Sequence, residues 1–106
     1  MLVGCGSGSG DRLVSVPWRT AGDLEAGPRD ISVTYTFPGY VCEYRFARAT
    51  VRETAETVTI EVLARYRPMP SGQACIAILG GGRTTVHLGT PLGRRRLEHA
   101  PAAGAL

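Results

Sequence analysis

Residues 58–66 carry the pattern that most limits how this chain can fold. Apolar side chains recur at every second position and polar ones stand between them: Val58, Ile60, Val62, Ala64 and Tyr66 against Thr59, Glu61 and Arg65. A period of two is typical of a strand with one buried and one exposed face. The segment therefore predicts a half-buried β-strand, with Ile60 and Val62 in the core.

The residues before this strand predict a partner for it over 41–52. Cys42, Tyr44 and Phe46 keep one parity, whereas Ala47, Ala49 and Val51 keep the other. A β-bulge near Ala47 would return both sets to one face, because a slip of one residue turns the side chains over. The polar segment 53–57 then joins the two strands as a hairpin, and Tyr44 is expected in the core.

Several further segments read as short strands. Residues 31–37 alternate most cleanly, with Tyr35 on the apolar face. The others are 11–18, ended by Pro17, then 75–79, 84–88 and an edge strand over 94–99; residues 19–30, 67–73 and 90–93 read as loops, and Gly80–Gly82 as a turn. No segment keeps a helical period. The chain is therefore predicted to be all-β, a small antiparallel β-sandwich (immunoglobulin-like) or a partly open barrel of six or seven strands.

The length of 106 residues has room for one domain. We expect a flexible leader or tether over 1–10, a β domain over 11–99 and a frayed tail over 100–106. Trp18, the only tryptophan, is expected to cover one end of the core. It precedes both strand-borne cysteines, whereas in an immunoglobulin domain the tryptophan lies between the bridged pair.

The chain has three cysteines, Cys5, Cys42 and Cys75, and no two of them have metal-ligand spacing. Cys42 and Cys75 lie in or beside apolar, strand-like segments. A disulfide between them is the leading interpretation, because such bridges are common in small exported domains. The alternative is two buried free thiols, which behave as small hydrophobic side chains.

Leu2-Val3-Gly4-Cys5 resembles a bacterial lipobox, in which the cysteine receives the lipid, and a Gly/Ser tether follows it. A lipobox closes a signal peptide. Lipidation of Cys5 therefore requires a native chain that begins upstream of Met1. The alternative is a disordered leader with a free thiol.

Residues 31–98 resemble small uncharacterised β domains of secreted proteins and lipoproteins of actinobacteria. The resemblance rests on Cys42, the Glu-Thr turn of the hairpin, residues 58–60, Cys75 and the string Val86-His87-Leu88-Gly89-Thr90-Pro91-Leu92-Gly93-Arg94-Arg95. It implies export and a β fold, and it brings no activity with it.

Side chains able to do chemistry are sparse and form no recognisable set. His87 lies on the polar parity of its strand and His99 lies near the tail, so His87 is the better of two weak catalytic candidates. Glu43 and Glu61 could face each other across the hairpin, but solvated pairing with Arg45 and Arg65 explains them more simply. Gly80–Gly82 lacks the residues of a phosphate loop. We therefore expect no enzyme, no catalytic residue, no cofactor and no metal.

All twelve basic residues are arginines, and the net charge is +3. A small excess spread over the chain is weak support for nucleic acid, which needs a basic stripe on one face. Arg94, Arg95 and Arg96 are the densest charge. They are expected to protect a sheet edge from aggregation, with binding of an anionic surface as the alternative.

The predicted function is a non-catalytic exported domain of the cell envelope, either a membrane-tethered binding module or a spacer. Its expected partner is an unknown protein or a cell-wall component, it contacts a membrane only through a lipid on Cys5, and it is a monomer. The alternative is a small secreted inhibitor that presents the 67–73 loop, with Met69 at its centre, to a protease.

Overall fold

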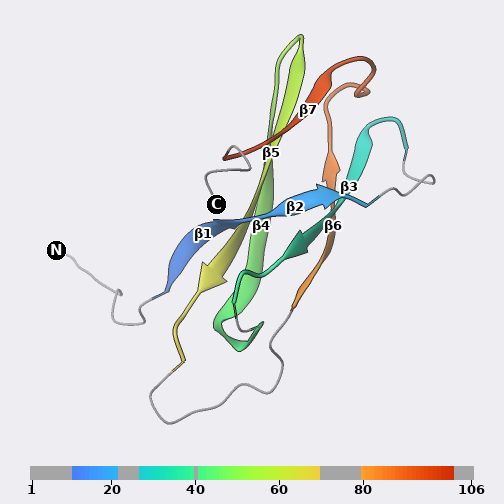
Figure 1. Ribbon diagram of the computed structural model, residues 1–106. Coiled ribbons are helices and arrows are strands. Elements are labelled where there is room, and N and C mark those ends of the chain that lie inside the picture. Colours follow the sequence, from blue (N-terminus) through green and yellow to red (C-terminus); the bar gives the residue numbers. More distant parts are fainter. Residues whose placement is uncertain (1–10, 22–26, 40, 70–79, 102–106) are drawn as a thin grey trace, which may run out of the picture.

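The computed structural model describes residues 11–21, 27–39, 41–69 and 80–101 (Figure 1). The strands are β1 (Arg12–Val16), β2 (Trp18–Thr20), β3 (Asp30–Thr36), β4 (Tyr44–Glu53), β5 (Thr57–Tyr66), β6 (Gly81–His87) and β7 (Arg96–His99), and the 3-10 turn η2 (Val41–Glu43) precedes β4. They form two sheets that face each other across one core and close no barrel among the described residues. The predicted all-β class is confirmed, in the form of a small β-sandwich.

Strand β5 is the centre of the first sheet. Strand β4 pairs antiparallel along one side of it, and the register shifts between Phe46 and Arg48, which confirms the predicted bulge. The other side of β5 is shared by two short strands: β1 pairs antiparallel with Val62–Tyr66, and β7 pairs parallel with Thr57–Ile60. In Figure 1 the β4–β5 hairpin accordingly runs as the long axis of the molecule.

The second sheet has the order β2-β3-β6, all antiparallel. Pro17 ends β1, as predicted, but the chain then continues as β2 in the other sheet instead of entering a loop. The interpretation of residues 19–30 as a loop was therefore wrong at its start. Proline has no N–H to give to a ladder, so it stands where the chain passes from one sheet to the other.

The prediction that Gly80–Gly82 turns the chain was also wrong, because Gly81 and Gly82 begin β6 and pair with Thr36 and Tyr35. A Cβ on Gly82 would lie 2.6 Å from the Tyr35 hydroxyl, and one on Gly81 would meet the Tyr35 carbonyl oxygen. Glycine is needed here because the Tyr35 ring lies across the strand at this point.

The core lies between the sheets and consists of the side chains at the inward-facing, alternate positions of the strands. Its fully buried side chains are Val16, Val33, Val58, Ile60, Val62 and Ala64, and Tyr35, Phe37, Val86 and Leu88 are nearly so. The core positions predicted for Tyr35, Ile60 and Val62 are confirmed. Tyr44 is only half-buried and packs against the margin of this cluster, as Trp18 does.

Some predicted features fall outside the described residues, namely the leader with Cys5, the strand over 75–79 with Cys75, and residues 70–73 of the inhibitory loop. The immunoglobulin-like arrangement therefore stays a prediction. Among the described residues there is no helix of the length and hydropathy that crossing a bilayer requires.

Candidate functional site

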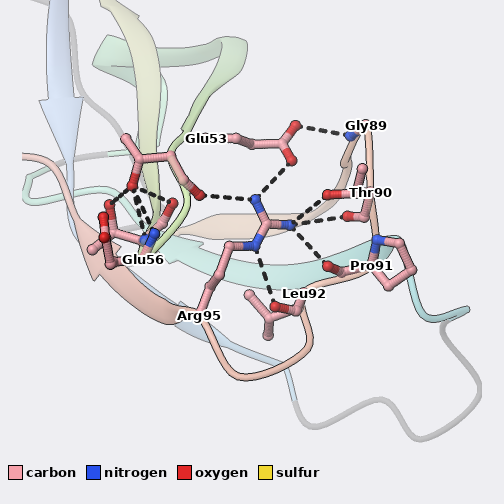
Figure 2. Close-up of polar contacts among 9 residues, drawn as sticks. Glu53, Glu56, Gly89, Thr90, Pro91, Leu92 and Arg95 are labelled. Atoms are coloured by element: carbon pink, nitrogen blue, oxygen red, sulfur yellow. Dashed lines mark hydrogen bonds and ion pairs between the residues drawn. The ribbon is translucent and has the colours of Figure 1, made fainter.

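Arg95 is the most heavily engaged polar side chain among the described residues, and its side chain is only 12% exposed. Figure 2 shows its guanidinium enclosed between Glu53 and the 89–92 loop. Its Nη2 donates to the carbonyl oxygens of Thr90 (3.0 Å) and Pro91 (2.9 Å), and its Nε donates to that of Leu92 (3.2 Å). Its Nη1 donates to Glu53 Oε1 at 3.1 Å and to the Thr54 carbonyl oxygen at 3.3 Å.

Glu53 completes this clamp from the end of β4. Its Oε2 accepts the backbone N–H of Gly89 at 2.8 Å, while its Oε1 binds Arg95. The Gly89 N–H, followed by the Arg95 guanidinium, stabilises the carboxylate and lowers the pKa of Glu53 below its ordinary value. The clamp fastens the turn at Gly93, which has the left-handed φ of 59° that favours glycine, to the tip of the β4–β5 hairpin.

The three consecutive arginines are therefore not one binding group. Arg95 is used inside the fold, Arg94 is exposed in a turn, and Arg96 begins β7, where its Nη2 lies 3.3 Å from Glu98 Oε2. Of the three only Arg96 stands on a strand, so the edge protection predicted for all of them can apply to Arg96 alone. Their binding of an anionic surface stays untested.

His99 lies at the junction of the two sheets. Its ring stacks on the Trp18 indole, with centroids 4.8 Å apart and planes at 7°. Its Nε2 accepts the backbone N–H of Trp18 at 3.1 Å, and its Nδ1 lies 2.8 Å from the Pro101 carbonyl oxygen. A carbonyl oxygen only accepts, so the proton is on Nδ1. The ring stack and Nε2 thus join β7 to β2, while Nδ1 binds the segment that follows β7. His99, expected next to the frayed tail, is the last residue of β7.

His87 is exposed on β6, as its parity predicts, and its Nδ1 lies 2.7 Å from Asp30 Oδ1 on the neighbouring strand. The side chain of His87 is 75% exposed and that of Asp30 is 37% exposed, so the two do not line an enclosed site. The expectation that His87 is not catalytic stays untested.

Glu43 holds the start of the 67–73 loop. Its backbone oxygen accepts the N–H of Arg67 at 2.9 Å, and its Oε2 accepts the N–H of Met69 at 3.2 Å. Met69 is therefore anchored beside η2, and it is the last residue of the loop that the structure describes. The alternative pairing of Glu43 with Glu61 was wrong, because Glu61 lies opposite Thr50 and accepts a hydrogen bond from Ser15.

The outer side of the first sheet gathers arginines that the sequence scatters. We call this surface the arginine face; it comprises Arg45, Arg48 and Arg52 of β4, Arg65 and Leu63 of β5, and Leu13 of β1. All four guanidinium groups are exposed and make no ion pair with a described residue. Glu61 of β5 and Glu98 of β7 are acidic side chains on the same outward side of the sheet, where Ser15 donates a hydrogen bond to Glu61 and Arg96 pairs with Glu98.

Two details of the hairpin produce this arrangement. The bulge puts Arg45 and Arg48 on the same side of β4, although they differ in parity. The register then sets Arg45 directly opposite Arg65, where the sequence had led us to expect solvated pairing of opposite charges. Like charges in directly opposed positions destabilise a sheet unless an anion compensates them.

A polar cavity of about 190 Å³ opens at this end of the arginine face. Its lining comprises Arg45, Arg65, Arg67, Asp11, Glu43, Tyr44 and Cys42. Arg67 Nε lies 3.7 Å from Asp11 Oδ1 across it. The sequence analysis missed this site because it considered each arginine separately. Listing the outward-facing residues of the two predicted strands, 41–52 and 58–66, side by side would have shown that the arginines share one face.

Among the described residues no group of three or more His, Cys, Asp or Glu side chains could hold a metal ion. Cys42 lies in η2 at the cavity, and Cys75 is outside the described residues, so their pairing stays a prediction.

No family model, no curated protein and no solved structure matches this chain.

Proposed function

We propose that this protein is a non-catalytic domain of the cell envelope, exported and held at the membrane through a lipid on Cys5, which works as a binding module. The observation that carries the proposal is the separation of two kinds of polar side chain. Arg95, Glu53 and His99 are used to hold the fold together, whereas the arginine face is exposed and unpaired among the described residues. A surface of this kind binds without needing a catalytic group.

The position of β1 supports the tether. Strand β1 lies at the edge of the first sheet and begins at Arg12, so the segment that carries Cys5 is attached beside the arginine face. A Gly/Ser tether of five residues spans only about 10–15 Å. The face would therefore be kept close to the surface that holds the lipid.

The predicted Cys42–Cys75 bridge supports export, because disulfides persist in oxidising compartments. Peptide mapping under non-reducing conditions should recover 42 and 75 in one linked species. Recovery of Cys42 linked to Cys5 instead would refute both the bridge and the lipid.

The decisive experiment is fractionation of the natural precursor with its upstream coding region. We expect the precursor to partition into membranes, and a Cys5→Ser precursor to be released. Bacterial lipidation adds several acyl chains, and each buried methylene contributes about 0.8 kcal/mol, so the anchor is stable. A precursor that fractionates as soluble with Cys5 intact would end the proposal.

A second candidate is the secreted inhibitor, which the anchoring of Met69 by Glu43 favours. A loop whose first residues are already fixed loses less conformational entropy when it binds, which raises its affinity. Titration against a panel of proteases tests it: inhibition that depends on Met69, compared in wild type and Met69→Ala, would put this candidate first. If no protease of the panel is inhibited, the inhibitor candidate is excluded and the envelope binding module is the one function that remains proposed.

A further inference from the structure

We propose that the arginine face docks directly on an anionic phospholipid bilayer, so that the folded domain, and not only a lipid on Cys5, contacts the membrane. The inference deepens the proposed function, because it rests on a position at the membrane surface. It names a partner for the arginine face.

The chemistry of the face fits phosphate esters. Guanidinium groups bind phosphate oxygens through paired N–H donors, and they retain their charge at any physiological pH. Arg45 and Arg65 stand directly opposite each other in the sheet, and neither makes an ion pair with a described residue, although Asp11 and Glu43 line the same cavity. A lipid phosphate between these two side chains would remove the repulsion and use donors that are otherwise solvated.

The apolar side chains of the face distinguish a bilayer from a soluble polyanion. Leu13 is 41% exposed and is the one large hydrophobic residue that is exposed in the described part of the chain. It stands opposite Arg65 on β1, and Leu63 lies next to Arg48 in the same face. Apolar side chains set among arginines can enter the acyl boundary while the guanidinium groups stay among the headgroups.

Single-stranded nucleic acid fits this surface less well. Its bases stack on aromatic side chains. On β4 and β5, Tyr44, Phe46 and Tyr66 take the inward parity. Tyr44 and Phe46 stack on Phe37 and Tyr35 at the margin of the core, and the Tyr66 ring lies tilted against Tyr44. The outward parity of the described sheet holds arginine, leucine, threonine and glutamate instead.

The test measures binding of the purified, unlipidated chain to vesicles of phosphatidylcholine with and without phosphatidylglycerol. The face variant is Arg48→Gln with Arg65→Gln. Its matched control is Arg29→Gln with Arg83→Gln, two exposed arginines outside the face, so that both variants lose the same charge. Circular dichroism and thermal melts establish that all proteins are folded.

We expect binding only to the vesicles that contain phosphatidylglycerol, and binding that weakens with salt. Basic residues near a bilayer contribute about 1 kcal/mol each, so the face variant should bind roughly 30-fold more weakly. The control should bind within a few-fold of the wild type. Equal losses in the two double variants would mean that net charge alone acts, and would overturn the proposal.

Leu13→Ser separates a bilayer from a soluble polyanion. It should weaken vesicle binding and leave binding to inorganic polyphosphate unchanged. Binding to polyphosphate or to an oligonucleotide without binding to vesicles would overturn the proposal in favour of another polyanion. Since the chain used is unlipidated, failure here leaves the Cys5 anchor standing, and failure of the fractionation experiment leaves this result standing.

Discussion

The indole of Trp18 and the imidazole of His99 lie nearly parallel, 4.8 Å apart between centroids, although 81 residues separate them in the chain. Trp18 reaches past His99 to donate its Nε1–H to the Ile60 carbonyl oxygen at 3.1 Å. This contact is where the second sheet is joined to the central strand of the first.

Replacing His99 should therefore destabilise the fold in two separable steps. His99→Phe keeps a ring for stacking and leaves the backbone N–H of Trp18 without its acceptor, a loss of about 1–3 kcal/mol. His99→Ala also removes the stacking and should cost more. Urea unfolding followed by Trp18 fluorescence measures both. His87→Phe, at an exposed histidine, is the control and should stay within about 0.5 kcal/mol of the wild type.

Arg95→Lys should destabilise the protein although it keeps the charge. The lysine ammonium has three donors on one atom and cannot reach both Glu53 and the carbonyl oxygens of the 90–92 turn. We expect a loss of about 1–3 kcal/mol in the free energy of unfolding. Arg94→Lys, at the exposed neighbour, should change it by less than about 0.5 kcal/mol. Equal small effects would mean that the clamp contributes nothing to stability.

Glu53 gives the stability a defined dependence on pH. Its pKa is lowered in the folded protein, chiefly by the Gly89 N–H, from an ordinary value of 4.5. Its contribution is thus fully present above pH 4.5, and it is lost as the pH falls below that value through the folded pKa. Urea unfolding across this window should show a shallower decline for Glu53→Gln than for the wild type. Glu56→Gln, in the same turn, should follow the wild type; parallel curves for all three would contradict the clamp.

Gly82→Ala should destabilise the protein, whereas Gly89→Ala should be tolerated. The new methyl at 82 would press on the Tyr35 ring, which is 8% exposed and stacked on Phe46 at 5.1 Å. Overpacking of this kind costs about 1–3 kcal/mol. At Gly89 the nearest atom to a new Cβ is Glu53 Oε2 at 3.5 Å, an ordinary contact. Thermal melts compare the two, and equal stability would mean that Tyr35 can move aside.

The β4–β5 hairpin, its bulge and the buried Ile60 and Val62 were predictable because each depends on local alternation. The roles of Gly82 and His99 were not, since each is set by a side chain on a distant strand, Tyr35 in one case and Trp18 in the other. In sequence, consecutive glycines are typical of a turn and a terminal histidine of a loose end. Pairing between distant strands overrides both local preferences.

The candidate site was hidden by a similar limit. The run of residues 94–96 is conspicuous in the sequence because its three charges are consecutive. Consecutive side chains of an extended segment point in different directions, however, so these three do not form one surface. Arg45, Arg48, Arg52 and Arg65 gather because the bulge and the hairpin register bring them to one face. The predicted bulge near Ala47 already implies that these arginines share one face, whereas the placement of Arg45 directly opposite Arg65 depends on the exact register.

The division of β5 between β1 and β7 has a consequence for the order of events during synthesis. The first described strand covers one half of its edge and the last covers the other half. A nascent chain that has released the β4–β5 hairpin still has half of that edge open until residues 96–99 emerge. The first sheet is therefore completed only after residues 96–99 have been synthesised, and β1 with the hairpin cannot close the edge of β5 by themselves.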